Sequence, residues 1–194
     1  MSEDKSNGYD AVAEEFLRVR SSIFGLATLR TWLDSLPRGG SILEVGAGSG
    51  VPLTEAIIDD GFEVYAVDAS ATMVKAFQQR FPDVQIRCEP AESSQFFDRT
   101  FDGVLAIGLV FLLAGEQQRE VIERMAAVLE PGGRLLFSAP KEMCEWNDSL
   151  TGQPSLSLGF DEYTRIIADS GLHLAGTYID EGDVFYYEAQ MPKD

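Results

Sequence analysis

The stretch Glu44-Val45-Gly46-Ala47-Gly48-Ser49-Gly50 decides the fold of this 194-residue chain. The apolar segment 41–45 leads directly into it, which predicts a strand that ends in a glycine-rich turn. Glycine lacks a β-carbon, so it adopts positive φ values and allows a ligand to lie against the backbone. In an open α/β sheet, ligands bind at the carboxyl ends of the strands. The turn is therefore a candidate binding site, although a turn from strand to helix also favours glycine for purely structural reasons.

Downstream of the turn, strand-like and helix-like segments alternate. The apolar periodicity predicts helices at 53–60, 71–80, 117–129 and 161–170, and strands at 62–67, 84–88, 101–107, 134–138, 172–179 and 184–190. The strand at 101–107 is apolar throughout, which is typical of a strand covered by helices on both faces. The pattern predicts an α/β fold: a doubly wound, mostly parallel seven-stranded sheet with a C-terminal antiparallel hairpin and helices on both faces.

Upstream of the turn, residues 9–36 carry apolar side chains at steps of three and four residues, which predicts helix. The composition leaves room for a break near Ser21-Ser22 or Gly25. We expect a single domain over residues 1–194, with an N-terminal helical arm at 1–38 and the sheet core at 39–194. The longest stretch without a clear period is 140–158.

The excess of acidic over basic residues limits the kinds of partner that we expect for this chain. It has 15 basic and 32 acidic residues, which give a formal net charge of −17. Because nucleic-acid affinity rests largely on basic residues that neutralise phosphates, we expect neither nucleic acid nor an anionic membrane surface as a partner. Alternatively, the charge has no part in recognition and only keeps the protein soluble.

The cysteine content and the hydropathy of the chain indicate the cellular compartment in which we expect the protein. Cys88 and Cys144 stand in no metal-binding spacing, so we expect no metal site and a reducing compartment. The N-terminus is polar and lacks the apolar segment of a secretory signal. No apolar run approaches the ~20 residues that a membrane span needs. These features predict a cytoplasmic protein.

Three residues around the glycine turn narrow the kind of ligand. The dinucleotide fingerprint G-x-G-x-x-G would need glycine where the chain has Val51. The carboxylate of Glu44 would repel a pyrophosphate but suits an ammonium or sulfonium group. Asp68 stands about 20 residues past the glycines, where an acid accepts hydrogen bonds from ribose hydroxyls. The pattern indicates a nucleoside with a cationic tail and no phosphates, which S-adenosylmethionine matches and NAD does not.

The chain resembles a class I, Rossmann-like S-adenosylmethionine-dependent methyltransferase over nearly its whole length. Its segment 42–50 is similar to the first motif of that family, and Tyr65-Ala66-Val67-Asp68-Ala69-Ser70 followed by Met73 is similar to the second. Pro90-Ala91-Glu92 stands where the family often has Asp-Ala-Glu, and 129–135 resembles the family's Leu-Lys-Pro-Gly-Gly segment. These motifs identify a cofactor and not a substrate.

The resemblance implies a set of cofactor-binding residues. Those along the methionine part of the cofactor and near its ammonium group are Glu44, Gly46, Ala47, Gly48 and Ile107. Those that hold the ribose or flank and bind adenine are Asp68, Ala69, Met73, Ala91 and Glu92. Pro90 replaces the acid that often contacts adenine, so that hydrogen bond is either absent or supplied by Glu89 or Glu92.

The sequence indicates no clear general base. The one histidine, His173, starts a strand and is expected to be partly exposed, and Phe111-Leu112 stands where some relatives have paired histidines. Because the sulfonium already activates the methyl group, alignment of the reacting atoms can supply roughly 7–11 kcal/mol of barrier lowering. Where a base is needed, the candidates are Glu142, Glu145 and Asp148, each of which is equally consistent with a solvated loop.

We expect a small organic acceptor with an apolar part. The residues expected around it are Tyr9, Leu109, Phe111 and Trp146. Tyr9 would close over the cofactor, as the N-terminal arm often does in this family, or is a surface aromatic. Three other functions stay open: a nicotinamide-dependent oxidoreductase, which Val51 and Glu44 oppose, a cofactor-binding module without transfer activity, and protein methylation as part of a complex.

Overall fold

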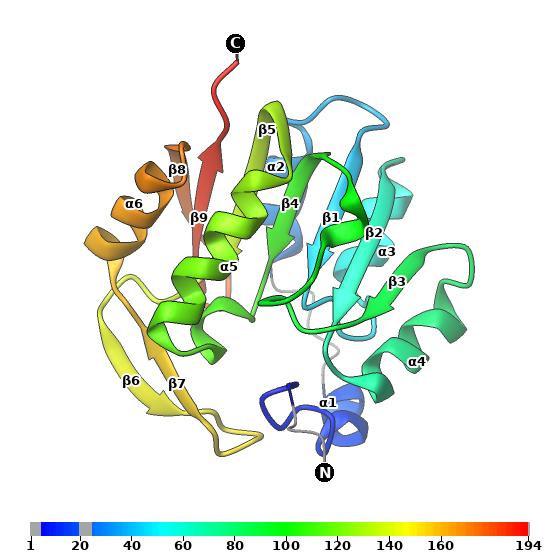
Figure 1. The fold of residues 1–194 in the computed structure, drawn as a ribbon. Helices are drawn as coiled ribbons and strands as arrows, with labels where there is room; N and C mark the ends of the chain where they lie inside the picture. Colours follow the sequence, from blue (N-terminus) through cyan, green and yellow to red (C-terminus); the bar gives the residue numbers. More distant parts are fainter. Residues whose placement is uncertain (1–4, 20–24, 194) are drawn as a thin grey trace.

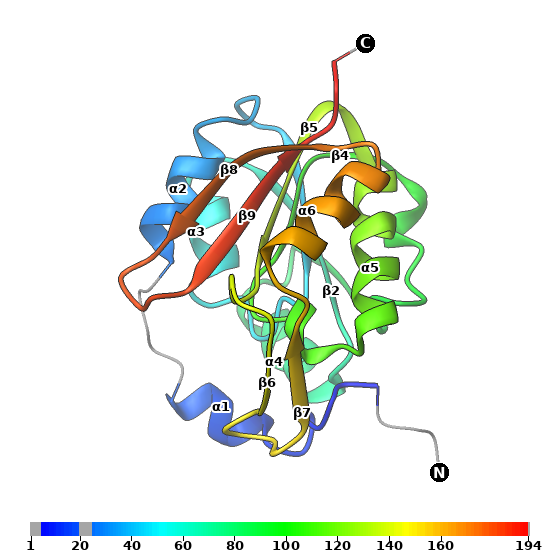
Figure 2. The same ribbon diagram turned by 90° about the vertical axis from the view of Figure 1, so that its left-hand side faces the viewer.

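The computed structural model describes residues 5–19 and 25–193, and its central β-sheet has helices on both faces (Figure 1, Figure 2). Within the described residues this sheet has seven strands in the spatial order β3-β2-β1-β4-β5-β9-β8. The strands are β1 (Ser41–Val45), β2 (Glu63–Asp68), β3 (Gln85–Cys88), β4 (Phe101–Ala106), β5 (Leu129–Ser138), β8 (His173–Ile179) and β9 (Phe185–Gln190). Strands β1 to β5 run parallel, and β9 pairs antiparallel with both β5 and β8. The predicted fold class is confirmed.

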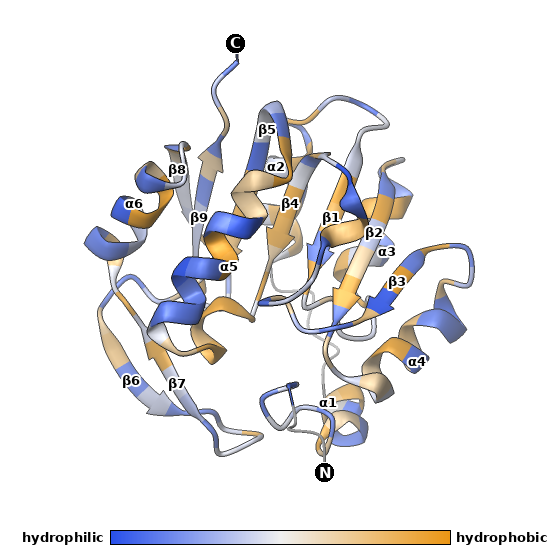
Figure 3. Ribbon diagram, viewed as in Figure 1, coloured by the Kyte–Doolittle hydropathy of each residue, from blue (hydrophilic) through white to orange (hydrophobic). Residues whose placement is uncertain are grey.

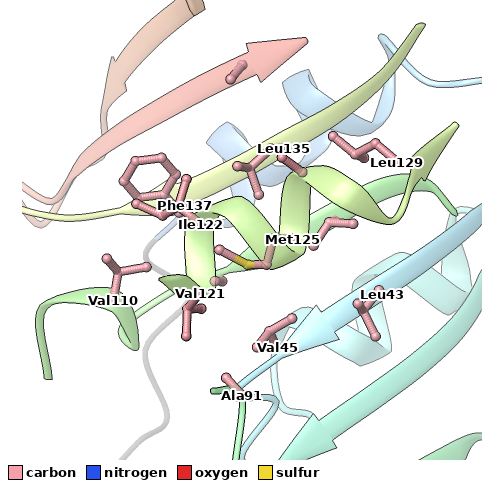
Figure 4. Close-up of a cluster of buried hydrophobic side chains, with 14 of the residues drawn as sticks. Leu43, Val45, Ala91, Val110, Val121, Ile122, Met125, Leu129, Leu135 and Phe137 are labelled. Carbon is pink, nitrogen blue, oxygen red and sulfur yellow. The ribbon is translucent and has the colours of Figure 1, made fainter. Parts of the chain in front are cut away.

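Helices cover the sheet in two layers. The helices of these layers are α2 (Leu26–Leu33), α3 (Leu53–Asp59), α4 (Ala71–Arg80), α5 (Gly115–Ala127) and α6 (Phe160–Asp169). A further helix, α1 (Ala13–Val19), lies below the strand ends in Figure 1, and short 3-10 helices η1 (Phe96–Asp98) and η2 (Val110–Leu112) stand on either side of β4 in the sequence. On one face, Trp32 of α2 and Ile57 of α3 pack in a buried cluster with Ile42 of β1. On the other face, α5 and α6 pack in a cluster with Leu43 of β1. Figure 4 shows the part of this cluster in which Ile122 and Met125 of α5 lie between β5 and β1.

The division of the core into one cluster on each face of the sheet follows from the alternation of side chains along the strands. Successive side chains of a strand point to opposite faces, so Ile42 and Leu43 enter different clusters and β1 is buried throughout. In Figure 3, hydrophobic colouring is concentrated on β2 and β4 inside the molecule, and hydrophilic stretches lie on α5 and α6. A sheet buried on both faces leaves its carboxyl edge as the place where side chains and backbone can meet a ligand.

The stretch 140–158, in which the sequence shows no clear period, contains regular structure that the sequence analysis did not predict. It contains a separate antiparallel hairpin of β6 (Cys144–Asn147) and β7 (Pro154–Ser157), seen beside α1 in Figure 2. Most side chains of β6 are exposed, so no alternation of apolar and polar residues marks this strand in the sequence.

The predicted helix at 9–36 is two helices in the part of the chain that the structure describes. Gly25, with a φ of 82°, is the N-cap of α2, so α2 begins there as a separate helix. The expected break at Ser21-Ser22 lies outside the described residues. No helix among residues 5–19 and 25–193 is long and apolar enough to cross a membrane.

Candidate functional site

The glycine turn joins β1 to α3 at the carboxyl edge of the sheet. Gly46, Gly48 and Gly50 have positive φ values of 76°, 57° and 79°. The backbone N–H groups of Gly46 and Ala47 donate to the carbonyl of Val67 in β2, at 2.9 and 3.2 Å. The turn is thereby held against the neighbouring strand, and its residues Gly46 and Gly48 border the space above the strand ends.

Asp68, the last residue of β2, joins this turn to α4. Its Oδ2 accepts from the N–H of Gly48 and its Oδ1 from the N–H of Ser70, both at 2.8 Å. Ser70 in turn caps α4 by accepting from the N–H of Met73. A carboxylate oxygen accepts more than one hydrogen bond, so these contacts orient Asp68 and leave it able to accept from a ligand hydroxyl as well.

A cavity of about 410 Å³ lies over this edge of the sheet. Small-molecule sites are typically about 300–1,000 Å³ in volume. From the predicted cofactor set, the residues that line it are Gly46, Gly48, Asp68, Ala69, Met73, Ala91, Glu92 and Ile107. From the predicted acceptor set, they are Tyr9, Leu109 and Phe111. The structure thus brings segments that are far apart in the sequence to one cavity.

Three of the predicted binding residues do not line the cavity. Glu44 is buried behind the turn, where its carboxylate accepts a hydrogen bond from Thr54 of α3. Ala47 packs in a small cluster with Phe77 of α4. Trp146 instead contacts the ring of a lining residue, Phe111, with ring centroids 5.4 Å apart.

The three acids expected as bases have different surroundings. Glu142 and Glu145 are exposed, and the structure does not bring them to the cavity. Asp148 lines it, and its Oδ1 accepts from the N–H groups of Leu150 and Thr151 at 3.0 and 2.8 Å. Burial acts to raise the pKa of Asp148, but these hydrogen bonds outweigh it and hold the pKa below its ordinary value. Asp148 is therefore an ionised loop anchor.

The N-terminal arm forms part of the cavity wall, and two of its described residues, Tyr9 and Asp10, join it to opposite sides of the cavity. The hydroxyl of Tyr9 donates to Oδ2 of Asp148, beside the β6–β7 hairpin, at 3.1 Å. Oδ1 of Asp10 accepts from the hydroxyl of Ser70 at 2.6 Å and from the N–H of Thr72 at 2.9 Å, at the start of α4. Figure 1 shows α1 below the strand ends, between the hairpin and α4. The arm thus bridges the two sides of the cavity.

The loop after β4 is joined to the end of β5. The N–H of Gly108 donates to the hydroxyl of Ser138 at 2.8 Å. Phe111 and Leu112, which follow β4, both line the cavity and give this side an apolar wall. His173 is exposed and does not line the cavity.

Several lining residues were not anticipated from the sequence. They include Lys5, Ser6, Asn7, Phe16, Pro52, Leu53, Ser138, Asp180, Val184 and Tyr186. Phe16 belongs to the apolar face of the predicted N-terminal helix, and that periodicity is a signal for packing rather than for binding. Asp180 and Tyr186 come from the β8–β9 hairpin, which reaches the cavity only because β9 pairs with β5.

The cavity wall combines glycine backbone, apolar side chains and acids. Asp68, Glu89 and Glu92 lie on the β2–β3 side, and Lys5 is the one basic side chain among the described residues of the wall. Such a wall suits an uncharged or cationic organic molecule better than a phosphate. Among residues 5–19 and 25–193, no group of three or more His, Cys, Asp or Glu residues is arranged to hold a metal ion.

The chain is similar in sequence to known methyltransferases. A family model described as a methyltransferase domain matches residues 42–133. The chain is 29% identical over 137 residues to the demethylmenaquinone methyltransferase of Paenarthrobacter aurescens, with 67% of this chain and 52% of that protein covered. It is 31% identical over 150 residues to the demethylmenaquinone methyltransferase of Beutenbergia cavernae, with 71% and 59% covered. The chain therefore spans between half and two thirds of the length of these relatives.

The fold is also similar to that of solved structures. One is the 1,6-didemethyltoxoflavin-N1-methyltransferase of Burkholderia thailandensis, with a TM-score of 0.75 and 17% identity over 95% of this chain and 86% of that chain. That structure has 1,6-didemethyltoxoflavin and S-adenosylhomocysteine bound. At this level of identity, the likeness shows a shared fold.

Proposed function

Because the chain belongs to the class I S-adenosylmethionine-dependent methyltransferase family, we propose that its cavity binds S-adenosylmethionine and that the protein transfers the cofactor's methyl group to a small organic acceptor. One observation carries the proposal: eight of the ten residues expected to hold the cofactor line the same cavity. The residues present fit this cofactor, because the wall offers a carboxylate for a ribose, apolar side chains for a base, and glycine backbone without a phosphate-binding cluster of basic groups.

In this proposal the cofactor lies along the carboxyl edge of the sheet. Asp68 accepts hydrogen bonds from the ribose, and the methionine part passes over Gly46 and Gly48. The adenine lies on the β2–β3 side, where the lining residues are Ala69, Met73, Ala91 and Glu92. Glu44 does not reach the cavity, so we propose that its buried charge favours the ammonium group from behind the turn and not by contact.

The acceptor side of the cavity supports an organic molecule with an apolar part. Leu109, Phe111 and Phe16 line it, and Trp146 supports Phe111 from behind. The relatives named for demethylmenaquinone and the structure that holds 1,6-didemethyltoxoflavin make such a molecule a reasonable class of acceptor. When bound, the cofactor supplies a methyl group that its sulfonium activates, so the chain's main task is to exclude water and align the acceptor.

Methyl-labelled S-adenosylmethionine tests the proposal. The protein is incubated with the labelled cofactor and a mixture of small metabolites, and the products are separated by mass. We expect the label in a small organic product, together with S-adenosylhomocysteine. Binding of the cofactor without label transfer to any small molecule would instead favour a binding module or a protein substrate.

A further inference from the structure

A serine hydroxyl at the end of β5 borders the cavity with its proton unused. Ser138 lines the cavity and is 1% exposed. Its Oγ accepts from the backbone N–H of Gly108 at 2.8 Å, and within the described part of the chain this is the hydrogen bond that the side chain makes. A hydroxyl group can donate one hydrogen bond as well as accept. The hydroxyl of Ser138 therefore keeps a donor for a ligand in the cavity.

Two other serines that are equally buried use both capacities of their hydroxyl groups. Ser94 donates to the carboxylate of Glu89 and accepts from a backbone N–H. Ser157 donates to a backbone carbonyl and also accepts from a backbone N–H. Buried polar groups are normally paired in this way, because a donor taken out of water without an acceptor is unfavourable. Ser138 differs from both serines in that it faces a cavity.

The order of the strands places Ser138 beside the methionine end of the proposed cofactor site. β5 lies next to β4 and is separated from β2 and β3 by β4 and β1. The residue after Gly108 is Leu109, and a β-carbon at Gly46 would lie 3.2 Å from the β-carbon of Leu109. Ser138, Gly108, Leu109 and Gly46 thus form a continuous part of the wall. The hydroxyl of Ser138 lies on the acceptor side of this part and away from the adenine side.

The rest of the wall limits the group that can accept the proton of Ser138. Asp148 and Asp180 line the same cavity, and hydrogen bonds keep the pKa of Asp148 below its ordinary value, so that it is ionised. A carboxylate or phosphate on the acceptor would be repelled by such charges. Leu109 and Phe111 give the acceptor side an apolar surface. These surroundings favour an uncharged oxygen, such as that of a carbonyl group, on a molecule with an apolar body.

We propose that Ser138 is a specificity-determining residue that donates a hydrogen bond to an uncharged carbonyl oxygen of the methyl acceptor. This inference rests on the proposed methyl transfer. The N–H of Gly108 holds the serine oxygen in place, and the serine proton holds the acceptor by a group other than the one that receives the methyl. The acceptor is accordingly an apolar molecule with a carbonyl group near the atom that is methylated.

Acetophenone and α-methylstyrene test this inference without knowledge of the natural acceptor. The two molecules have similar shape, but only acetophenone has an oxygen that accepts a hydrogen bond. Their affinities are measured by NMR titration, with and without saturating S-adenosylhomocysteine, on the wild type, Ser138→Ala and Ser138→Cys. The quantity compared is the ratio of the two affinities, because a general loosening of the cavity changes both affinities and cancels in the ratio.

Ser155→Ala is the matched control. Ser155 lies in β7 and is 2% exposed, and its hydroxyl has no hydrogen-bond partner among residues 5–19 and 25–193. It does not line the cavity. Its substitution therefore removes a buried serine hydroxyl without removing a donor from the cavity wall.

We expect Ser138→Ala to lower the ratio of acetophenone affinity to α-methylstyrene affinity roughly 3- to 10-fold relative to the wild type, the range of one hydrogen bond. Ser138→Cys should lower it less, because a thiol is a weak donor. Ser155→Ala should keep the ratio of the wild type, and all variants should keep their affinity for S-adenosylhomocysteine.

A ratio that is the same in the wild type and in Ser138→Ala would overturn the inference, as would a wild type that binds neither probe. A Ser138→Ala variant that loses affinity for S-adenosylhomocysteine and keeps the ratio would assign the hydroxyl to the cofactor instead, and would overturn it too. A wild type that fails to bind S-adenosylhomocysteine would contradict the proposed function, while the titration without cofactor still reports on Ser138.

Discussion

Single residues in the site combine a structural contact with a proposed contact to the ligand. Asp68 orients the glycine turn through Gly48 and the start of α4 through Ser70. Because Asp68 is held by these contacts, the place of its carboxylate in the cavity is set before a ligand binds, which lowers the ordering cost of binding.

Asp68→Ala should weaken the binding of S-adenosylhomocysteine by about 1.5–3 kcal/mol, because hydrogen bonds from the ribose to a charged group are lost. Calorimetric titration measures this. Asp102→Ala is the matched control, since Asp102 also accepts a backbone N–H bond, from Ser41 at 2.8 Å, but lies outside the cavity. An unchanged affinity in a folded Asp68→Ala variant would place the ribose elsewhere.

Gly50→Ala should destabilise the fold more than Gly61→Ala. Both glycines have positive φ, which costs an alanine about 1–2 kcal/mol. A β-carbon at Gly50 would also lie 2.6 Å from the ring of Phe81 and 2.9 Å from that of Phe77, whereas one at Gly61 would meet nothing within 4 Å. Overpacking adds about 1–3 kcal/mol. Urea unfolding measures both variants, and equal losses would show that the rings move aside freely.

Elements with local signals at both ends were predictable, and those that depend on distant pairing were not. The helix predicted at 71–80 is α4, because Ser70 caps it and Phe81-Pro82 stops it. The glycine turn and Asp68 were predictable for the same reason, since strand, turn and acid are close in sequence. In the sequence, Tyr186 cannot be distinguished from a buried aromatic residue of an ordinary strand. It lies at the cavity only because β9 pairs with β5.

The contacts of Asp148 and Asp10, which join the N-terminal arm to the β6–β7 hairpin and to α4, should contribute less stability at low pH. The pKa of Asp148 is lowered in the folded state by hydrogen bonds from the loop that outweigh its burial, and the pKa of Asp10 is lowered by bonds from Ser70 and Thr72. A lowered pKa contributes stability that is full above the unfolded aspartate value of about 3.9 and is lost as pH falls through the folded value.

Asp148→Asn removes the titratable carboxylate and keeps one side-chain oxygen that can accept the hydrogen bonds from the loop N–H groups of Leu150 and Thr151. We expect the variant to be less stable than the wild type by about 1 kcal/mol near neutral pH, allowing for solvent screening of a partly exposed group. The difference should shrink as pH falls below about 4. Urea unfolding across this range checks it, with the exposed Glu142→Gln as control. A difference that stays constant with pH would show that the charge of Asp148 does not matter.

At the scale of the whole molecule, the sheet order separates the two proposed halves of the site. The adenine side lies at the ends of β2 and β3, and the proposed acceptor side lies after β4, where Leu109 and Phe111 line the cavity. The arm and the β6–β7 hairpin complete the wall between them. Around this cavity the net charge of −17 gives the molecule a field that repels polyanions.

The field leads to a prediction about partners. Because binding to nucleic acid depends on neutralising phosphates, fluorescently labelled tRNA should show no change in anisotropy with the protein even at low salt, where such binding is strongest. Saturable binding that weakens as salt is added would contradict a small-molecule acceptor as the main partner.

The central claim is that the cavity holds a phosphate-free, cationic nucleoside. Calorimetric titration of the wild type with S-adenosylmethionine, S-adenosylhomocysteine and NADH tests it most directly. We predict saturable heat from the first two, at one site per chain, and none from NADH, because Val51 and the acidic wall do not suit a pyrophosphate. Saturable heat from NADH, with none from the two sulfur nucleosides, would contradict the account.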